Sequence, residues 1–239
     1  MACATLELPV SESYPRLLSL AVHELRTPIS VVGGYLRLLQ HPNAEQLTDR
    51  QRKMIEEAEK SCSRLSALIG ELSDISKLDS GVLTLGRQPV DVFPLVAEVA
   101  GHVHEAEDRG VHLETRGDSG GAVVSGDAAR LRSAFDAVFR AILREKAGPC
   151  TVIAEKRRMT SNGGTSAVVV IADENDVQDL YESPAGVFDE KRGGLGLALP
   201  LARRVIEQHG GRLWSAAPRG GGDDGRARGS AIISLPLAQ

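Results

Sequence analysis

The sequence predicts an α+β protein, with a helical hairpin first and a two-layer α/β sandwich after it. Apolar residues in the first third of the chain recur at alternating steps of four and three, as in helices that pack along one narrow stripe. After Gly81 the pattern changes to short β-like runs between amphipathic stretches, without a regular strand–helix alternation. We therefore predict a helical domain over residues 1–81 and a sandwich domain over residues 82–239.

Two stripes define the predicted hairpin. The first stops before His41-Pro42-Asn43, which breaks a helical pattern. The second follows Thr48 and Gln51, which have the spacing of a capping box at a helix start. The stripes consist of Leu18, Val22, Leu25, Ile29, Val32, Leu36 and Leu39, and of Met54, Ala58, Ser61, Leu65, Leu68, Leu72 and Ile75.

Oligomeric state follows from the shape of these stripes. One hairpin cannot bury two narrow stripes well, whereas two hairpins can bury all four as a four-helix bundle. We therefore predict a homodimer with two-fold symmetry.

The remaining elements of the prediction belong to the sandwich. Ser161–Gly164 is predicted to be a hairpin turn between two strands, and Arg219–Gly229, rich in Gly, Asp and Arg, a mobile loop. Predicted strands are His112–Thr115, Ala122–Ser125, Cys150–Glu155, Ala167–Ala172, Leu213–Ala216 and Ala231–Leu235. Predicted helices are Phe93–Asp108, Ala128–Arg144 and Leu195–Gln208.

Composition and charge exclude several classes of protein. Of the 239 residues, 42% are hydrophobic and 25% are charged, as in an ordinary globular protein. The net charge of −4 gives no reason to expect a nucleic-acid partner. No apolar run approaches the roughly 20 residues of a membrane span, and the N-terminus lacks the pattern of a secretory signal, so we expect a cytoplasmic protein. Three widely separated cysteines predict neither a disulfide framework nor a metal site.

A histidine on the first helix is the strongest candidate for chemistry. His23 follows Val22 of the stripe but lies off it, so its imidazole should face water and act as a nucleophile near pH 7. Glu24 can accept a ring proton, and the hydroxyl of Thr27 lies one turn away on the same face. Pro28 removes an amide donor and should bend the helix. On spacing alone, an ordinary surface histidine is the favoured alternative.

The segment HELRTP, which begins at His23, closely resembles the histidine box of bacterial two-component sensor histidine kinases. The resemblance implies that His23 carries a phosphoryl group and that Glu24 assists its phosphorylation. It implies that Thr27 supports dephosphorylation of a partner response regulator. Ile75–Gly81 is similar to the family's exit from the dimerisation hairpin, and the resemblance extends from about Leu17 to Leu237.

A glycine-rich segment, Arg192–Leu199, precedes a predicted helix. Glycines there let a phosphate approach the backbone and the helix N-terminus, although a tight turn is the alternative on the residues alone. The segment resembles the second glycine box of the family's ATP-binding domain, and Val187–Glu190 and His209–Gly211 resemble further elements of it. Asp173, at a predicted strand end, is either a turn former or, by resemblance, the acceptor for the adenine amino group. The resemblance implies that Gly194, Leu195, Gly196 and Leu197 bind ATP.

Magnesium chemistry is where the chain first departs from the family. The family's asparagine box places its two asparagines at Ala137 and Ala141, and the second normally holds Mg²⁺. Alanine has no ligand oxygen, whereas Mg²⁺ demands near-octahedral oxygen coordination. Asp136 and Glu145 are close in sequence but out of register. We therefore predict no metal ligand in this chain.

The first glycine box and the lid depart as well. After Asp173 the expected glycines are absent, and Glu174 and Asp176 place negative charge beside a site meant for a polyanion. Only 21 positions separate Asp173 from Gly194, which leaves a short lid over a nucleotide.

These observations predict a two-component histidine kinase that uses ATP to phosphorylate His23 and passes the group to an aspartate of a response regulator. The alternative is a degenerate member without autokinase activity, which acts as a response-regulator phosphatase, a phosphorelay protein or a scaffold. Retention of Glu24 and Thr27 favours a phosphatase or relay over a scaffold. ATP and Mg²⁺ are implied by the family, and the departures put both in doubt.

Overall fold

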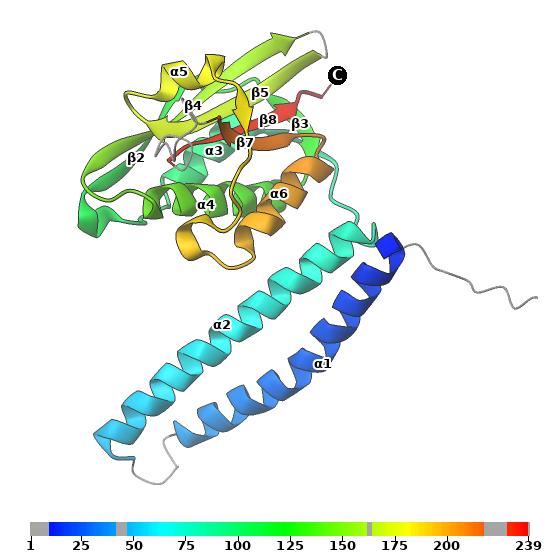
Figure 1. The fold of residues 1–239 in the computed structure, drawn as a ribbon, viewed down its shortest axis with the longest axis vertical. Helices are drawn as coiled ribbons and strands as arrows, with labels where there is room; N and C mark the ends of the chain where they lie inside the picture. Colours follow the sequence, from blue (N-terminus) through cyan, green and yellow to red (C-terminus); the bar gives the residue numbers. More distant parts are fainter. Residues whose placement is uncertain (1–9, 42–46, 162–163, 218–228, 239) are drawn as a thin grey trace, which may run out of the picture. The chain divides into compact units, whose positions relative to one another are not determined.

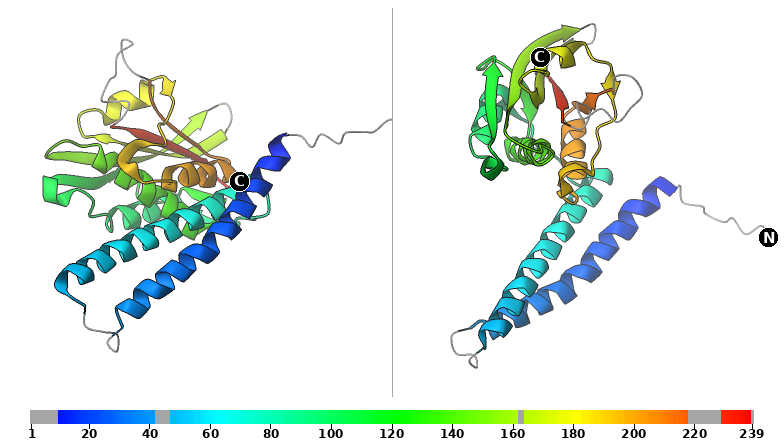
Figure 2. Two further views of the ribbon diagram at one scale, coloured as in Figure 1. Left: turned by 60° about the horizontal axis from the view of Figure 1, so that its bottom comes forward. Right: turned by 60° about the vertical axis from the view of Figure 1, so that its left-hand side comes forward.

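The structure, a computed structural model, describes residues 10–41, 47–161, 164–217 and 229–238. The chain divides into two compact units, and the boundary lies between Thr84 and Leu85. The first unit contains helices α1 (Val10–Leu39) and α2 (Asp49–Asp79), which lie side by side and antiparallel (Figures 1 and 2). The predicted helical hairpin is confirmed.

The ends of α2 form as the sequence predicts. The Thr48 hydroxyl accepts a hydrogen bond from the Gln51 amide at 3.3 Å, and the Gln51 side chain accepts one from the Thr48 amide at 2.9 Å. Both donors would otherwise lack a partner within the helix, so the pair defines where α2 begins. Beyond the last turn, Gly81 has φ +68°, a left-handed conformation that glycine adopts without strain.

Small side chains make the contact between α1 and α2. Cys62 is buried, and its Sγ donates to the Ile29 carbonyl at 3.5 Å. The Ser76 hydroxyl donates to the Pro15 carbonyl at 2.9 Å. A Cβ on Gly33 would lie only 3.2 Å from Cys62 Sγ. The two backbones therefore approach closely at Gly33 and Cys62.

The residues of the predicted stripes divide between this contact and the surface. On α2 the stripe residue Ile75 is buried, as are Cys62 and Ile69 off the stripe, whereas the stripe residues Met54 and Leu65 are 64% and 49% exposed. On α1 Val22 is buried. The stripe residues that remain largely exposed on α1 are Leu25, Val32 and Leu39. The spacing of apolar residues does not show whether a stripe faces the other helix of the hairpin or a different surface. Small residues of α2 such as Cys62 add little to a hydrophobic pattern.

The second unit is a mixed sheet with helices on both faces (Figure 1). Its strands are β1 (Gln88–Asp91), β2 (Val111–Gly117), β3 (Val123–Gly126), β4 (Cys150–Ser161), β5 (Gly164–Asp173), β6 (Ala185–Gly186), β7 (Arg212–Ala216) and β8 (Ala231–Pro236). Its helices are α3 (Val92–Ala100), α4 (Ala128–Arg144), α5 (Val177–Glu182) and α6 (Ala198–Gln208), with 3-10 turns η1 (Glu107–Arg109) and η2 (Arg192–Gly194).

Within the described residues, six strands form one sheet in the order β2-β4-β5-β8-β7-β6. β2 pairs parallel with β4, and the other neighbours pair antiparallel. β1 and β3 form a separate antiparallel ribbon. Helices α3, α4 and α6 cover one face of the sheet, and the short α5 lies on the opposite face (Figures 1 and 2). The predicted α+β sandwich is confirmed.

Two predicted boundaries need comment. The helix predicted over Phe93–Asp108 is wrong beyond Ala100, because the chain turns at Gly101 and Ala106 has φ +65°. β4 and β5 pair with Ser161 opposite Gly164, while Asn162 and Gly163 of the predicted turn lie outside the described residues. Residues 219–228 of the predicted loop also lie outside them.

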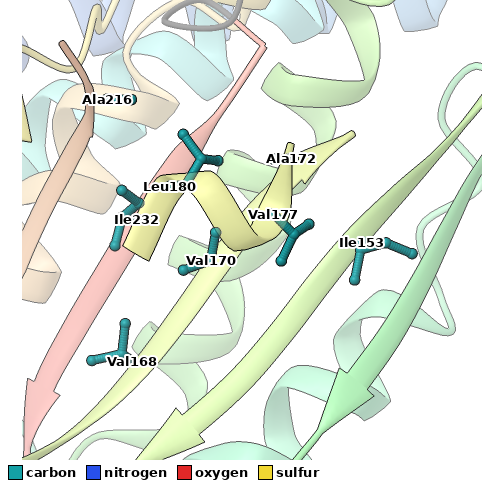
Figure 3. Close-up of a cluster of buried hydrophobic side chains, with 8 residues drawn as sticks. All are labelled: Ile153, Val168, Val170, Ala172, Val177, Leu180, Ala216 and Ile232. Carbon is teal, nitrogen blue, oxygen red and sulfur yellow. The ribbon is translucent and has the colours of Figure 1, made fainter. Parts of the chain in front are cut away.

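Each face of the sheet has its own hydrophobic cluster. The helix-covered face buries large aromatic side chains, including Phe93, Phe135 and Phe139. On the opposite face Val177 and Leu180 of α5 pack over β5 and β8 (Figure 3). Members of that cluster are Ile153, Val168, Val170, Ala172, Val177, Leu180, Ala216 and Ile232. This second cluster holds α5, the helix that follows Asp173, against the sheet.

Candidate functional site

His23 lies on the exposed side of α1. Its side chain is 79% exposed, and its Nδ1 lies 3.3 Å from Oε1 of Glu24. When Nδ1 carries the proton, it donates to this carboxylate and Nε2 presents a lone pair to solvent. The buried neighbour Val22 faces the hairpin interior, so helix geometry alone turns His23 outward.

Thr27 follows one turn later and is also exposed. Pro28, inside α1, has no N–H to donate to the Glu24 carbonyl. The structure thus brings His23, Glu24 and Thr27 together on one accessible stretch of α1.

Asp173, the candidate adenine acceptor, ends β5 as predicted but already has a cationic partner. Its Oδ1 lies 2.9 Å from Nζ of Lys146, which is buried and also donates to the Gly229 carbonyl at 3.0 Å. The ion pair uses Oδ1, and the carboxylate retains Oδ2 as a further hydrogen-bond acceptor.

The glycine-rich segment sits directly on α4. Gly193 and Gly194 have φ +65° and +61°, and Gly196 has φ +66°. A Cβ on Gly193 would lie 2.8 Å from Cα of Ala141, so the loop touches the helix at the position of the family's second asparagine. Leu195 and Leu197 lie in the turn that leads into α6.

The peptide groups of Gly193 are already used. Its N–H donates to Oε1 of Glu145 at 2.9 Å, and its carbonyl accepts from Arg144 at 3.2 Å. Arg144 also donates to Glu105 at 2.8 Å, which holds the pKa of that carboxyl below its usual range. The end of α4 therefore binds the loop through both a donor and an acceptor.

Arg192 is a residue that sequence reasoning missed. Its guanidinium is buried and donates to the carbonyls of Asp189 and Ser230 at 3.1 and 2.9 Å and to the Ser215 hydroxyl at 3.0 Å. It also stacks 4.3 Å from the centre of the Phe188 ring. Nothing in the local sequence distinguishes it from a surface arginine beside two glycines.

The residues at this place do not fit magnesium. Ala137 and Ala141 are buried and have no ligand oxygen. Asp136 is engaged by Arg140 at 2.8 Å, and Glu145 by the loop amide. Among the described residues no group of three or more His, Cys, Asp or Glu side chains could hold a metal ion.

After Asp173 the chain crosses to the other face of the sheet. Gln178 of α5 donates to Glu155 at 3.1 Å and accepts from Arg157 at 3.0 Å. The Arg157 guanidinium lies 4.5 Å from the centre of the Tyr181 ring, and burial raises the pKa of Tyr181. These contacts hold α5 on the face of the sheet opposite to α3, α4 and α6 (Figure 1).

Comparison with known proteins follows this geometry. The family model of the His Kinase A (phospho-acceptor) domain matches residues 16–81. The chain is 30% identical over 226 residues to the signal transduction histidine-protein kinase BaeS of Escherichia coli, covering 90% of this chain and 45% of BaeS. It is 32% identical over 218 residues to the sensor protein CutS of Streptomyces coelicolor, covering 87% of this chain and 50% of CutS.

The chain contains a His Kinase A domain and is a homologue of sensor histidine kinases. This histidine kinase homologue spans about half the length of these curated relatives. The matched segment contains His23, Glu24 and Thr27. No helix in the described part of the chain is long and apolar enough to cross a membrane.

Solved histidine kinase structures share the fold. Full-length ShkA, crystallised with AMPPNP, superposes with a TM-score of 0.67 at 22% identity and covers 94% of this chain and 46% of its own. The histidine kinase AdeS of Acinetobacter baumannii superposes with a TM-score of 0.56 at 16% identity. The match covers 91% of this chain and 98% of the AdeS chain. At these identities the likeness establishes the fold of the histidine kinase homologue.

Proposed function

We propose that the protein is a dimeric two-component signalling protein in which His23 exchanges a phosphoryl group with an aspartate of a response regulator. The exposed pair of His23 and Glu24, with Thr27 one turn along α1, carries this proposal. Residues 1–81 form the dimerisation and phosphotransfer domain, and residues 82–239 form an ATP-binding-like domain.

The exchange uses the free ring nitrogen of His23. Nε2 attacks the phosphorus of an aspartyl phosphate on the receiver, an N–P bond forms, and the P–O bond to the carboxylate breaks. The carboxylate leaves with the electron pair. The ring keeps its proton on Nδ1 and gains positive charge, which the Glu24 carboxylate stabilises. In the phosphatase direction, Thr27 orients a water molecule toward the same aspartyl phosphate.

Apolar side chains left on the surface of the hairpin support a homodimer. A second copy would bury them, and exposed apolar patches of this kind mark interaction surfaces. They include Leu17, Leu25, Val32, Leu39, Met54 and Leu65.

We propose that the phosphoryl group comes from a phosphorylated receiver rather than from ATP. Ala141 has no metal ligand, Gly193 lies against it, and Lys146 pairs with Asp173. These contacts favour the degenerate alternative over autophosphorylation, which the family resemblance implies.

The first experiment compares two phosphoryl donors on the full chain. Labelled phosphoramidate, a direct chemical donor to histidine, should give acid-labile, base-stable label on the peptide that contains position 23 in the unaltered protein and in the His112→Ala control, and none on that peptide in His23→Ala. Labelled ATP with Mg²⁺ should give none on any of the three. Label from ATP that depends on His23 would restore the autokinase proposal.

A second step tests the partner and the phosphatase direction. Receiver domains phosphorylated with labelled acetyl phosphate should lose label faster with the protein than alone, and Thr27→Ala should slow the release of inorganic phosphate on the order of 10²-fold or more. Equal labelling of His23→Ala by phosphoramidate would show that His23 is an ordinary surface histidine.

A further inference from the structure

The glycine-rich segment is held on α4 by a backbone contact that leaves no room for a side chain. Cβ of a residue in place of Gly193 would lie 2.8 Å from Ala141 Cα and 3.2 Å from its carbonyl oxygen. A Cβ atom does not approach another heavy atom this closely in a folded protein, so the contact with Ala141 requires glycine at position 193. The neighbouring Gly194 has nearly the same φ, but its Cβ would meet nothing within 4 Å.

Hydrogen bonds close both sides of this contact. Glu145 accepts from the Gly193 amide and Arg144 donates to the Gly193 carbonyl, so the peptide groups around Gly193 are satisfied from α4 and the residue after it. In a phosphate-binding loop the Gly193 amide would point to the ligand. Here Glu145 supplies its acceptor.

A buried cation holds the segment from the sheet side. Arg192 is 5% exposed and donates to Asp189, Ser215 and Ser230. Removing the loop from α4 would pull Arg192 from its acceptors, and a buried polar group without partners is costly. The closed position is therefore the one that satisfies all these groups.

We propose that Arg192–Leu197 is a structural clasp that closes on α4 without a nucleotide, with Arg192 as its internal cation. Gly193 serves close packing on Ala141 rather than the approach of a phosphate. This inference concerns the second unit alone and does not depend on phosphoryl transfer by His23.

The neighbouring glycines give a matched test. Gly193→Ala and Gly194→Ala place the same methyl group at nearly the same positive φ, so backbone strain is shared. Only Gly193→Ala drives that group into Ala141. We expect the melting temperature of Gly193→Ala to fall about 5 °C further than that of Gly194→Ala. Equal melting temperatures would overturn the clasp, because they would mean that the loop stands away from α4.

Nucleotide titration of the unaltered full chain gives an independent readout, including where Gly193→Ala does not fold. The fluorescent analogue mant-ATP should show no saturable change up to about 1 mM, with or without Mg²⁺. Saturable binding that displaces with unlabelled ATP would overturn the clasp. Neither measurement uses His23 or a receiver. Failure here would remove the support for excluding ATP as the donor, but it would leave the exchange between His23 and a receiver standing, and the reverse also holds.

Discussion

His209 and His23 show how surroundings separate a structural histidine from a reactive one. At His209 both ring nitrogens are used: Nε2 accepts from the Asp127 amide at 2.9 Å, and Nδ1 donates to the Val205 carbonyl at 2.6 Å. The ring also packs against Gly126, where a Cβ would lie 2.5 Å from Cδ2. His23 has one nitrogen beside Glu24 and the other open to solvent. Of these two histidines, His23 is therefore the one with a ring nitrogen that can act on an incoming phosphorus.

This difference predicts opposite effects of two alanine variants. His209→Ala leaves the Asp127 amide without an acceptor and should lower the free energy of unfolding by about 1–3 kcal/mol. Urea denaturation measures the loss, and His112→Ala, an exposed histidine of the same unit, serves as the control. Phosphoryl capture from phosphoramidate should be unchanged in His209→Ala. A stable variant that fails to capture phosphate would place His209 in the chemistry instead.

At the scale of elements, the clearest patterns in the sequence predict the most. α4 covers the predicted range Ala128–Arg144 because its apolar positions are strongly periodic, and Asp127 marks its start. α5 is not predicted, because six residues are too few to show a helical repeat of apolar residues. Its contacts with Glu155 and Arg157 are to residues about 20 positions away in sequence. The exposed position of His23 follows from the stripe. The buried partners of Lys146 and Arg192 depend on tertiary contacts and could not be predicted.

The cap of α4 carries a pH-dependent prediction. Hydrogen bonds from the amides of Arg130 and Gly86 hold the pKa of Asp127 below its usual value. A depressed folded-state pKa adds stability above the unfolded pKa of about 4, and the gain is lost as the pH falls through the folded value. Asp127→Ala should cost about 1 kcal/mol at pH 7.

The measurement is urea denaturation of three proteins between pH 7 and pH 3. The gap between the unaltered protein and Asp127→Ala should narrow below about pH 4. Asp127→Asn, a cap that does not titrate in this range, should keep a constant advantage over Asp127→Ala. A gap that stays constant in the unaltered protein would show that the Asp127 carboxylate is not part of the acid response.

At the scale of the whole molecule, the hairpin separates two kinds of surface. Small residues such as Gly33, Cys62 and Ser76 meet inside it, while larger apolar residues such as Val32 and Leu65 stay exposed. A folded monomer would leave the second set in water. We therefore expect the oligomeric state to depend on the exposed stripe and not on the hairpin contact.

Val32→Glu tests this expectation. Burying a glutamate in a two-fold interface brings two like charges together and desolvates both, so the dimer should dissociate. Light scattering after size exclusion should report the mass of one chain for Val32→Glu and of two chains for the unaltered protein. Lys60→Glu, exposed and off the stripe, should remain dimeric. A dimeric Val32→Glu with unchanged helix content would move the interface elsewhere.

The contact between Gly193 and Ala141 also constrains how this chain can change over generations. Ala141 is fully buried beside the loop, so a larger side chain such as asparagine at this position would press against the loop while it rests on α4. A ligand oxygen at position 141 would therefore require the loop to be released, at the expense of the bonds made by Arg192. Two changes would have to occur together, and either one alone is expected to destabilise the protein.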